Sequence, residues 1–211
     1  MRKLNVLLML GLLFLTPLLF SAERPKTKLL HPSTVILQGM IEPYSVKKAI
    51  SELITVKESG QKELYLYIDS LGGDFNAAVW MGRNMEAAQA AGMSITCYAG
   101  PRVASAAYYI YLHCSNRYAL KTSMLFPHTI HVSIPEFVLP EELIVIGIRS
   151  LVAQKEWDGY ARNITGMNEE DYLAYRDSDD APWTIEQILE KSTKKWFTVV
   201  DYYLLKVDTH Q

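Results

Sequence analysis

The chain has 211 residues, of which 49% are hydrophobic and 21% are charged, and its formal net charge is -2. This length and composition allow one domain with a substantial core and exclude two large ones. Lysines and arginines are scattered along the chain, which excludes the concentrated positive surface that nucleic-acid binding requires. We therefore expect no nucleic-acid partner.

The first 22 residues have the layout of an export signal. Arg2 and Lys3 precede an apolar run over residues 4–20, and two small residues follow it before the next charges. The run is at the lower limit of length for spanning a bilayer. Two outcomes stay open, a signal peptide that is removed and an N-terminal membrane anchor. In both, we expect the body of the protein outside the cytoplasm, either periplasmic or anchored to the membrane from outside.

Residues 23–33 are polar and contain proline, which predicts a linker, so we assign residues 34–211 to one domain. Its first half alternates between strand and helix patterns. A strand pattern ending near Ile41 precedes an amphipathic helix that Ser45 is placed to cap. The later elements are a strand at 63–70, a helix at 74–92, a strand at 94–100, a helix at 104–114 and one or two short strands within 117–129. This alternation predicts parallel strands joined by helical crossovers, in which ligands bind at the carboxyl ends of the strands.

The second half of the domain is predicted to be helical. One long helix is expected over residues 141–162, and it is apolar nearly all round between Leu143 and Ile148. Such a helix must be covered on every side, so we expect part of its cover to come from another subunit. Two shorter helices, within 168–177 and 184–192, flank the acidic loop "DSDDAPW".

Ser105 stands among small residues where a predicted strand gives way to a predicted helix. A serine in this position is usually a cap or a close-packing residue. Here, however, Gly72 and Gly73 end the preceding strand, so their amides can point to the same sheet edge as Ser105 and the amide of Ala106. A hydroxyl beside two backbone N–H groups is the arrangement that acyl transfer requires.

His128 closes the strand "SMLFPHT" and is the first candidate for a general base at that edge, and His131 is the second. A histidine base needs an acceptor that fixes its tautomer. The loop "RDSDDAPW" offers Asp177, Asp179 and Asp180 for this role.

The order of "LYLYIDSLGG", "GPRVASAAYY", "RYALKTSMLFPHT" and "RDSDDAPWT" resembles the proteolytic subunit of the Clp protease (ClpP), over roughly residues 34–188. The resemblance implies an α/β fold of the ClpP/crotonase superfamily, built from repeated β-β-α units with a long protruding helix used for oligomerisation, as a homo-oligomeric ring. It implies a serine endopeptidase acting on peptides or unfolded proteins, without cofactor or metal. It places the nucleophile on Ser105, the base on His128, the orienting carboxylate on Asp180 and the oxyanion hole on Gly73 and Ala106.

Asp177 and Asp179 stay open as alternatives to Asp180. Members of the family receive substrate from a cytoplasmic ATP-driven unfoldase, and an exported protein would lack that partner. Membrane-bound relatives use a serine and a lysine, for which Lys121 is the candidate here. The crotonase branch, which acts on acyl-CoA thioesters, does not need this serine and histidine together. A non-catalytic oligomeric scaffold is the alternative that is not an enzyme.

The two cysteines, Cys97 and Cys114, flank the Ser105 turn on either side. A strand running in and a helix running back could bring them together as a disulfide in an oxidising compartment. Unpaired core cysteines are the commoner arrangement, and we expect two free thiols.

Overall fold

A computed structural model describes residues 26–30, 34–134, 136–178 and 181–205 of the chain. Its centre is a six-stranded parallel sheet with the strand order β2-β3-β4-β5-β7, in which β6 also pairs with β4. The strands are β2 (Thr34–Ile41), β3 (Glu63–Gly73), β4 (Ser94–Ala104), β5 (Asn116–Leu120), β6 (Met124–Phe126) and β7 (Thr198–Val200). The predicted mixed α/β fold with parallel strands is confirmed.

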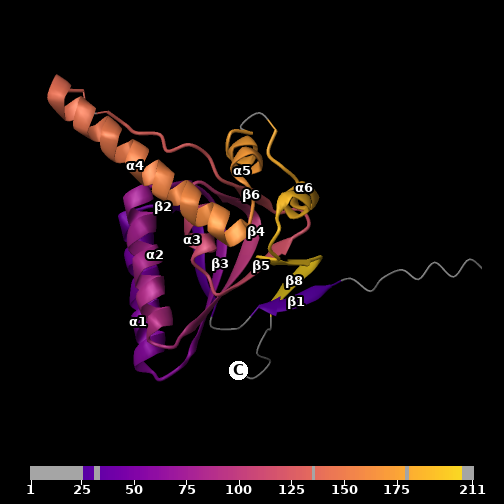
Figure 1. Ribbon diagram of the computed structural model, residues 1–211. Coiled ribbons are helices and arrows are strands. Elements are labelled where there is room, and N and C mark those ends of the chain that lie inside the picture. Colours follow the sequence, from indigo (N-terminus) through magenta and orange to yellow (C-terminus); the bar gives the residue numbers. More distant parts are fainter. Residues whose placement is uncertain (1–25, 31–33, 135, 179–180, 206–211) are drawn as a thin grey trace, which may run out of the picture.

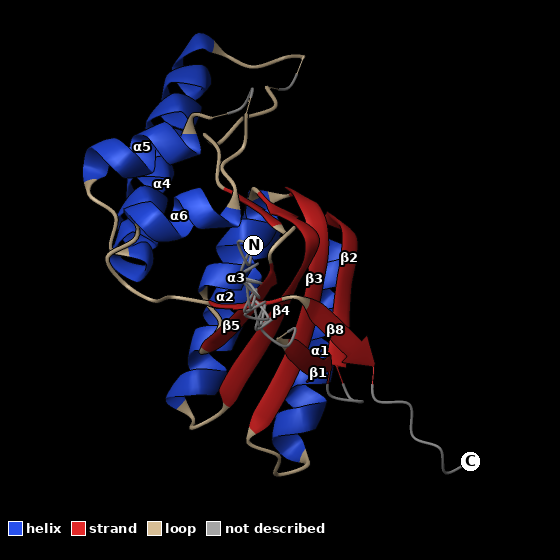
Figure 2. Ribbon diagram, turned by 90° about the vertical axis from the view of Figure 1, so that its right-hand side faces the viewer, coloured by secondary structure: helices blue, strands red, loops and turns tan. Residues whose placement is uncertain are grey.

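Three helices make the crossovers between neighbouring strands and cover one face of the sheet (Figure 2). They are α1 (Pro43–Glu58), α2 (Phe75–Ala90) and α3 (Ala106–Leu112). Leu66 and Ile68 of β3 are fully buried, as are Met81 and Met85 of α2, which belong to the same core. Burial of this apolar surface is the main favourable term that holds the helices to the sheet.

The caps of α1 and α2 differ from each other. Asp74 caps α2 with its side chain, which accepts a hydrogen bond from the amide of Ala77 at 3.0 Å. Glu42, and not the predicted Ser45, is the N-cap residue of α1. Ser45 lies three residues inside the helix, and its hydroxyl accepts a hydrogen bond from the Glu42 amide at 3.1 Å. The Ser45 hydroxyl therefore still gives the Glu42 amide a hydrogen-bond partner, but it does so from within the first turn of the helix.

The long helix is present as α4 (Pro140–Thr165) and projects away from the sheet (Figure 1). Its C-terminal part packs into the core through Trp157, Ala161 and Thr165, while the apolar side chains of its N-terminal part are exposed. Two short helices follow, α5 (Glu169–Arg176) and α6 (Ile185–Lys191). Within the part of the chain described, no helix is long and apolar enough to cross a membrane, and the leader lies outside that part.

The segment predicted to be a linker contains a strand. β1 (Thr27–Leu30) pairs in parallel with β8 (Tyr202–Leu205), and the two form a small separate sheet. The amide of Asp201 donates to the carbonyl of Lys26 at 2.7 Å, next to this pairing. The four residues of β1 are too few to give a strand pattern that the sequence alone would reveal. The strand is recognised only from its pairing with β8, which the other end of the chain supplies.

The expectation of two free thiols was wrong, because Cys97 and Cys114 form a disulfide. Their Cα atoms are 5.9 Å apart, a separation that a disulfide spans without distortion of the backbone. Cys97 lies on β4 and Cys114 lies two residues after the end of α3, so the strand and the returning helix place the two side chains together in the core.

Candidate active site

Three neighbouring strands bring Ser105 and His128, two of the predicted catalytic residues, to one edge of the sheet. β3 pairs with β4 and β4 pairs with β6, all in parallel, so their carboxyl ends point the same way. These strands end at Gly73, Ala104 and Phe126. Ser105 follows Ala104 at once, and His128 follows Phe126 by two residues. This edge is where an α/β sheet places its ligand sites.

Ser105 has a backbone conformation that only glycine adopts without strain. Its φ is +53° and its ψ is -127°, and it is the sole non-glycine residue with positive φ in the part of the chain that the structure describes. Its amide donates to the carbonyl of Phe126 at 2.9 Å, which fixes the start of α3 beside the end of β6. Strained residues of this kind occur mainly at functional sites, where the surroundings hold them.

Two successive glycines lie in close contact with neighbouring backbone, Gly72 against this turn and Gly73 against Ile41 of β2. A Cβ added to Gly72 would lie 2.5 Å from the Cβ of Ser105 and 2.9 Å from the carbonyl oxygen of Ala104, so a side chain cannot be accommodated there. At Gly73, an added Cβ would lie 2.2 Å from the carbonyl oxygen of Ile41. Both glycines have positive φ, of +105° and +147°. The Gly-Gly pair is therefore required by the close approach of the two backbones.

Three amide groups near this turn could donate to an oxyanion, those of Gly72, Gly73 and Ala106. Gly72 donates its amide to the hydroxyl of Ser70 at 3.0 Å, so this amide is not a good candidate for an oxyanion hole. Ala106 is the first residue of α3, and the first amides of a helix have no acceptor within the helix. Gly73 and Ala106 remain the candidates for oxyanion donors, as the sequence predicts.

The imidazole of His128 is half-buried and has a defined hydrogen-bond partner. Its Nδ1 atom lies 2.6 Å from the carbonyl oxygen of Thr129. A carbonyl accepts only, so Nδ1 donates this hydrogen bond, and in the neutral imidazole Nε2 is then the acceptor nitrogen. The ring of His131, the second candidate, lies 5.2 Å from the ring of His128, centroid to centroid. The role of Thr129 is not visible in the sequence, because any residue can supply a carbonyl.

Of the three aspartates considered as orienting groups, Asp179 and Asp180 lie outside the described residues. The carboxylate of Asp177 is paired with Arg176, with an Nε–Oδ1 distance of 2.7 Å, and this hydrogen bond is the main reason why the pKa of Asp177 is lowered. Asp177 also accepts a hydrogen bond from the hydroxyl of Thr129 at 3.4 Å. It therefore lies next to the residue that follows His128, but it is paired with Arg176, which also binds Asp158 at 2.6 Å.

Lys121, the candidate base of a serine-lysine dyad, is engaged elsewhere. Its Nζ atom lies 2.8 Å from the Oδ1 atom of Asp201, and its backbone amide donates to Val200. It precedes β6, whereas His128 follows that strand, so β6 separates Lys121 from the edge that carries Ser105.

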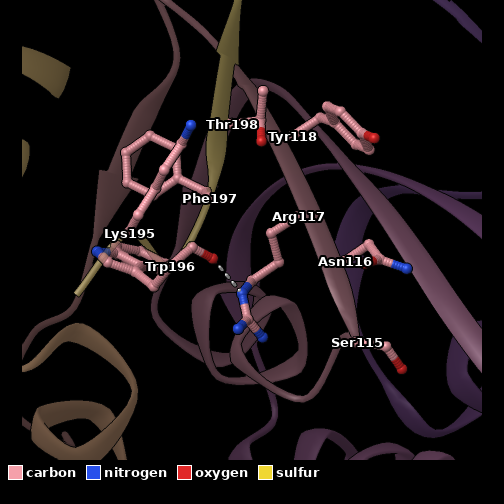
Figure 3. A pocket seen from close by; sticks show the side chains of 8 residues that line it. All are labelled: Ser115, Asn116, Arg117, Tyr118, Lys195, Trp196, Phe197 and Thr198. Carbon is pink, nitrogen blue, oxygen red and sulfur yellow. Dashed lines mark hydrogen bonds between the residues drawn. The ribbon is translucent and has the colours of Figure 1, made fainter.

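Two pockets are present away from this edge. One, at the amino ends of β5 and β7, is lined by Arg117, Lys195 and neighbouring residues, and Arg117 donates to the carbonyl of Trp196 at 2.8 Å (Figure 3). The other lies between α2, α3 and α4 and includes His113 and Trp157. Neither pocket includes Ser105 or His128. Among the described residues, no group of three potential metal ligands occurs.

Comparison with known proteins gives one family. The sequence model of the Clp protease family matches residues 21–135, more than half of the chain, and the match includes the Gly-Gly turn, Ser105 and His128. The matched segment ends before Asp177, so it does not reach the acidic loop. A search of curated proteins gave no match. The fold, the strand-end turn and this match agree, and the chain belongs to the Clp protease family.

Proposed function

We propose that this protein is a serine endopeptidase that hydrolyses peptides or unfolded proteins. The observation that carries the proposal is the strained Ser105 at the end of β4, held by Phe126 and packed against Gly72. A serine in a purely structural role would gain nothing from this strained conformation, which costs free energy. A nucleophile gains from it, because the turn presents its hydroxyl at the sheet edge.

In the proposed reaction, the Ser105 hydroxyl attacks the carbonyl carbon of the scissile peptide bond and His128 Nε2 takes its proton. The negative charge that develops on the substrate oxygen is stabilised by the amides of Gly73 and Ala106. The protonated His128 then gives its proton to the leaving amine, and water releases the acyl group by the same steps. We assign the orienting carboxylate to Asp180, with Asp177 and Asp179 as alternatives. The Thr129 carbonyl supports the same tautomer of His128.

A serine-lysine dyad is the less favoured mechanism. A lysine base must be close to the serine and must lose its proton, which a neighbouring carboxylate opposes. Lys121 is paired with Asp201 and lies before β6, so both conditions argue against it.

The test is the change Ser105→Ala, with Ser59→Ala as the control. Ser59 is an exposed serine at the end of α1 and is remote from the strand-end turn. We expect the Ser105 variant to lose cleavage of unfolded casein by several orders of magnitude, and to lose labelling by a fluorophosphonate probe, while the Ser59 variant keeps both. Equal cleavage by the parent and the Ser105 variant would show that Ser105 is not the nucleophile. Failure of the parent to cleave or to be labelled would favour the non-catalytic scaffold.

We further propose that the protein assembles as a homo-oligomeric ring and acts outside the cytoplasm. The exposed apolar residues of α4 support assembly, since such a surface is seldom left in contact with water. Export is supported by the leader pattern and by the disulfide, because disulfides persist in oxidising compartments.

A further inference from the structure

The disulfide encloses the proposed nucleophile. Ser105 stands eight residues after Cys97 and nine residues before Cys114, close to the middle of the loop that the disulfide closes. The loop consists of the last part of β4, Ser105 and the whole of α3. The covalent link therefore joins the two arms that meet at the strained residue.

Non-covalent contacts hold both ends of α3, and the disulfide adds a covalent link at the far end, where Gln89 also donates to the His113 carbonyl at 2.6 Å and Arg117 to the Leu112 carbonyl at 2.7 Å. The Ser105 amide is bound to Phe126, and the Ser105 carbonyl accepts from Tyr109 within the first turn of α3. At the far end, Ser115 exchanges two hydrogen bonds with Ile95 of β4, at 2.8 and 3.1 Å. The disulfide is the covalent member of this second attachment. It fixes the position of a seven-residue helix that is too short to be stable by itself.

The disulfide is also protected from reductants. Cys97 is 0% exposed and Cys114 is 3% exposed, so a thiol reagent cannot reach either sulfur without opening the core. Once formed, the link is a lasting part of the fold and does not respond quickly to its surroundings. Any effect of the disulfide on the site is therefore set when the bond forms.

We propose that formation of the Cys97–Cys114 disulfide sets the geometry of Ser105, so that the peptidase becomes fully active only after oxidation. This inference rests on the proposed function, since it assigns the control of the same site. In the oxidation step, the two thiols lose two protons and two electrons to a disulfide-containing oxidant, such as oxidised glutathione, which becomes two thiols. Before this step, only non-covalent contacts attach α3 to β4, and we expect the strained turn to relax towards a conformation that does not present the hydroxyl.

The test compares the oxidised parent, the parent refolded with a reductant, and the double variant Cys97→Ala/Cys114→Ala. Each preparation is checked for secondary structure by circular dichroism. The rate of Ser105 labelling by a fluorophosphonate and the kcat and KM for a peptide substrate are then measured. We expect both preparations without the disulfide to be folded, with labelling and kcat at least ~10-fold lower and KM little changed, because small displacements of a catalytic group have effects of this size or more. Oxidised glutathione supplied while the reduced parent is unfolded and refolded again should restore its activity, and the same treatment should leave the double variant unchanged.

Equal labelling and kcat with and without the disulfide would overturn the inference. So would complete unfolding of both preparations, because the disulfide would then support the whole fold and not the turn. If only the alanine pair fails to fold, Cys97→Ala/Cys114→Val replaces it, since valine restores part of the buried volume. Failure of the proposed function looks different, since the oxidised parent itself would then show no labelling that depends on Ser105.

Discussion

The backbone of Ser105 is strained, and contacts with the surrounding residues hold it in that conformation. A non-glycine residue held in such a sparsely populated region of backbone conformation costs about 1–3 kcal/mol. Gly72 is the neighbour that allows it, because a side chain at that position would occupy the space of the Ser105 Cβ. The two residues depend on each other, since the serine can adopt this turn only where the facing backbone has no Cβ.

The change Gly72→Ala tests this dependence, with Gly60→Ala as a matched control. Both glycines have positive φ, but an added Cβ at Gly60 meets nothing within 4 Å. We expect Gly60→Ala to lower the free energy of unfolding by about 1 kcal/mol and to leave peptide hydrolysis unchanged. Gly72→Ala should displace Ser105 and lower kcat by about 100-fold. Unchanged hydrolysis in the Gly72 variant, measured on folded protein, would contradict the assigned contact.

At this scale the sequence predicts much of the candidate site. Gly73, Ser105, Ala106 and His128 can be placed at one edge from the order of strands and glycines alone, and the structure puts three strand ends there. The hydrogen bond from His128 to the Thr129 carbonyl could not be predicted, because it depends on a ring orientation and on a backbone atom. The choice of aspartate could not be made either, because three aspartates within four positions share the same sequence signal.

The elements α2, α3 and α4 meet at His113, which is almost fully buried. Its ring lies 4.5 Å from the rings of both Tyr109 and Tyr160, and its Nε2 atom lies 3.3 Å from a carboxylate oxygen of Glu86. Burial lowers the pKa of His113 below its ordinary value of 6.5, and the Glu86 carboxylate opposes this only in part. The imidazole is therefore neutral at this junction of three helices at neutral pH.

A lowered pKa in the folded protein means that the unfolded chain binds a proton more readily. The contribution of neutral His113 to the free energy of unfolding should therefore be fully present above about pH 6.5. As the pH decreases below this value, the free energy of unfolding should fall, with a slope approaching about 1.4 kcal/mol per pH unit. Urea unfolding at several pH values between neutral and mildly acidic measures this slope. His113→Phe should reduce it, since phenylalanine fills the space between the tyrosines without titrating. His131→Gln, a change at an exposed loop, should retain it. An unchanged slope in the His113 variant would show that other groups cause the pH dependence.

The elements themselves were predictable where local pattern decides them. The strand and helix alternation up to residue 129 and the long helix follow from hydrophobic periodicity and glycine positions. β1 was not predictable, because a four-residue strand that pairs with the opposite end of the chain has almost no local signal. β4 also continues four residues beyond its predicted end at Gly100, to Ala104. Pairing with β6 supports this extension, and it is the extension that carries the chain to Ser105.

The molecule as a whole consists of a compact α/β body and the long helix α4. The C-terminal part of α4 packs against the body, and its N-terminal part projects from it (Figure 1). On the projecting part of α4, exposed apolar side chains recur at helical spacing. They are Leu143, Ile144, Val145, Ile148, Leu151 and Val152. A helix that is stable in water does not keep this many apolar groups exposed without a partner surface, and a second copy of the chain carries a surface of the same kind.

The change Leu151→Glu tests whether this surface mediates self-association. Leu151 is 73% exposed in the single chain, so the change should leave the fold of the subunit intact. In an assembled interface, the new carboxylate would be buried without a partner, at a cost of several kcal/mol. A loss of only about 1.4 kcal/mol already raises the dissociation constant tenfold. Sedimentation velocity over a range of protein concentrations should therefore show the parent as an oligomer and the variant shifted to smaller species.

The control is Lys48→Glu, which places the same carboxylate at an exposed polar position of α1, away from the apolar surface of α4. It should sediment as the parent does if the apolar side chains of α4, and not the net charge of the subunit, drive assembly. A shift of equal size in both variants would assign the effect to electrostatic repulsion. A parent that stays monomeric at every concentration would show that α4 does not mediate assembly in solution. Ile144→Glu, at a position 63% exposed and two helical turns before Leu151, should reproduce the effect of Leu151→Glu, because residues seven apart lie on the same side of a helix.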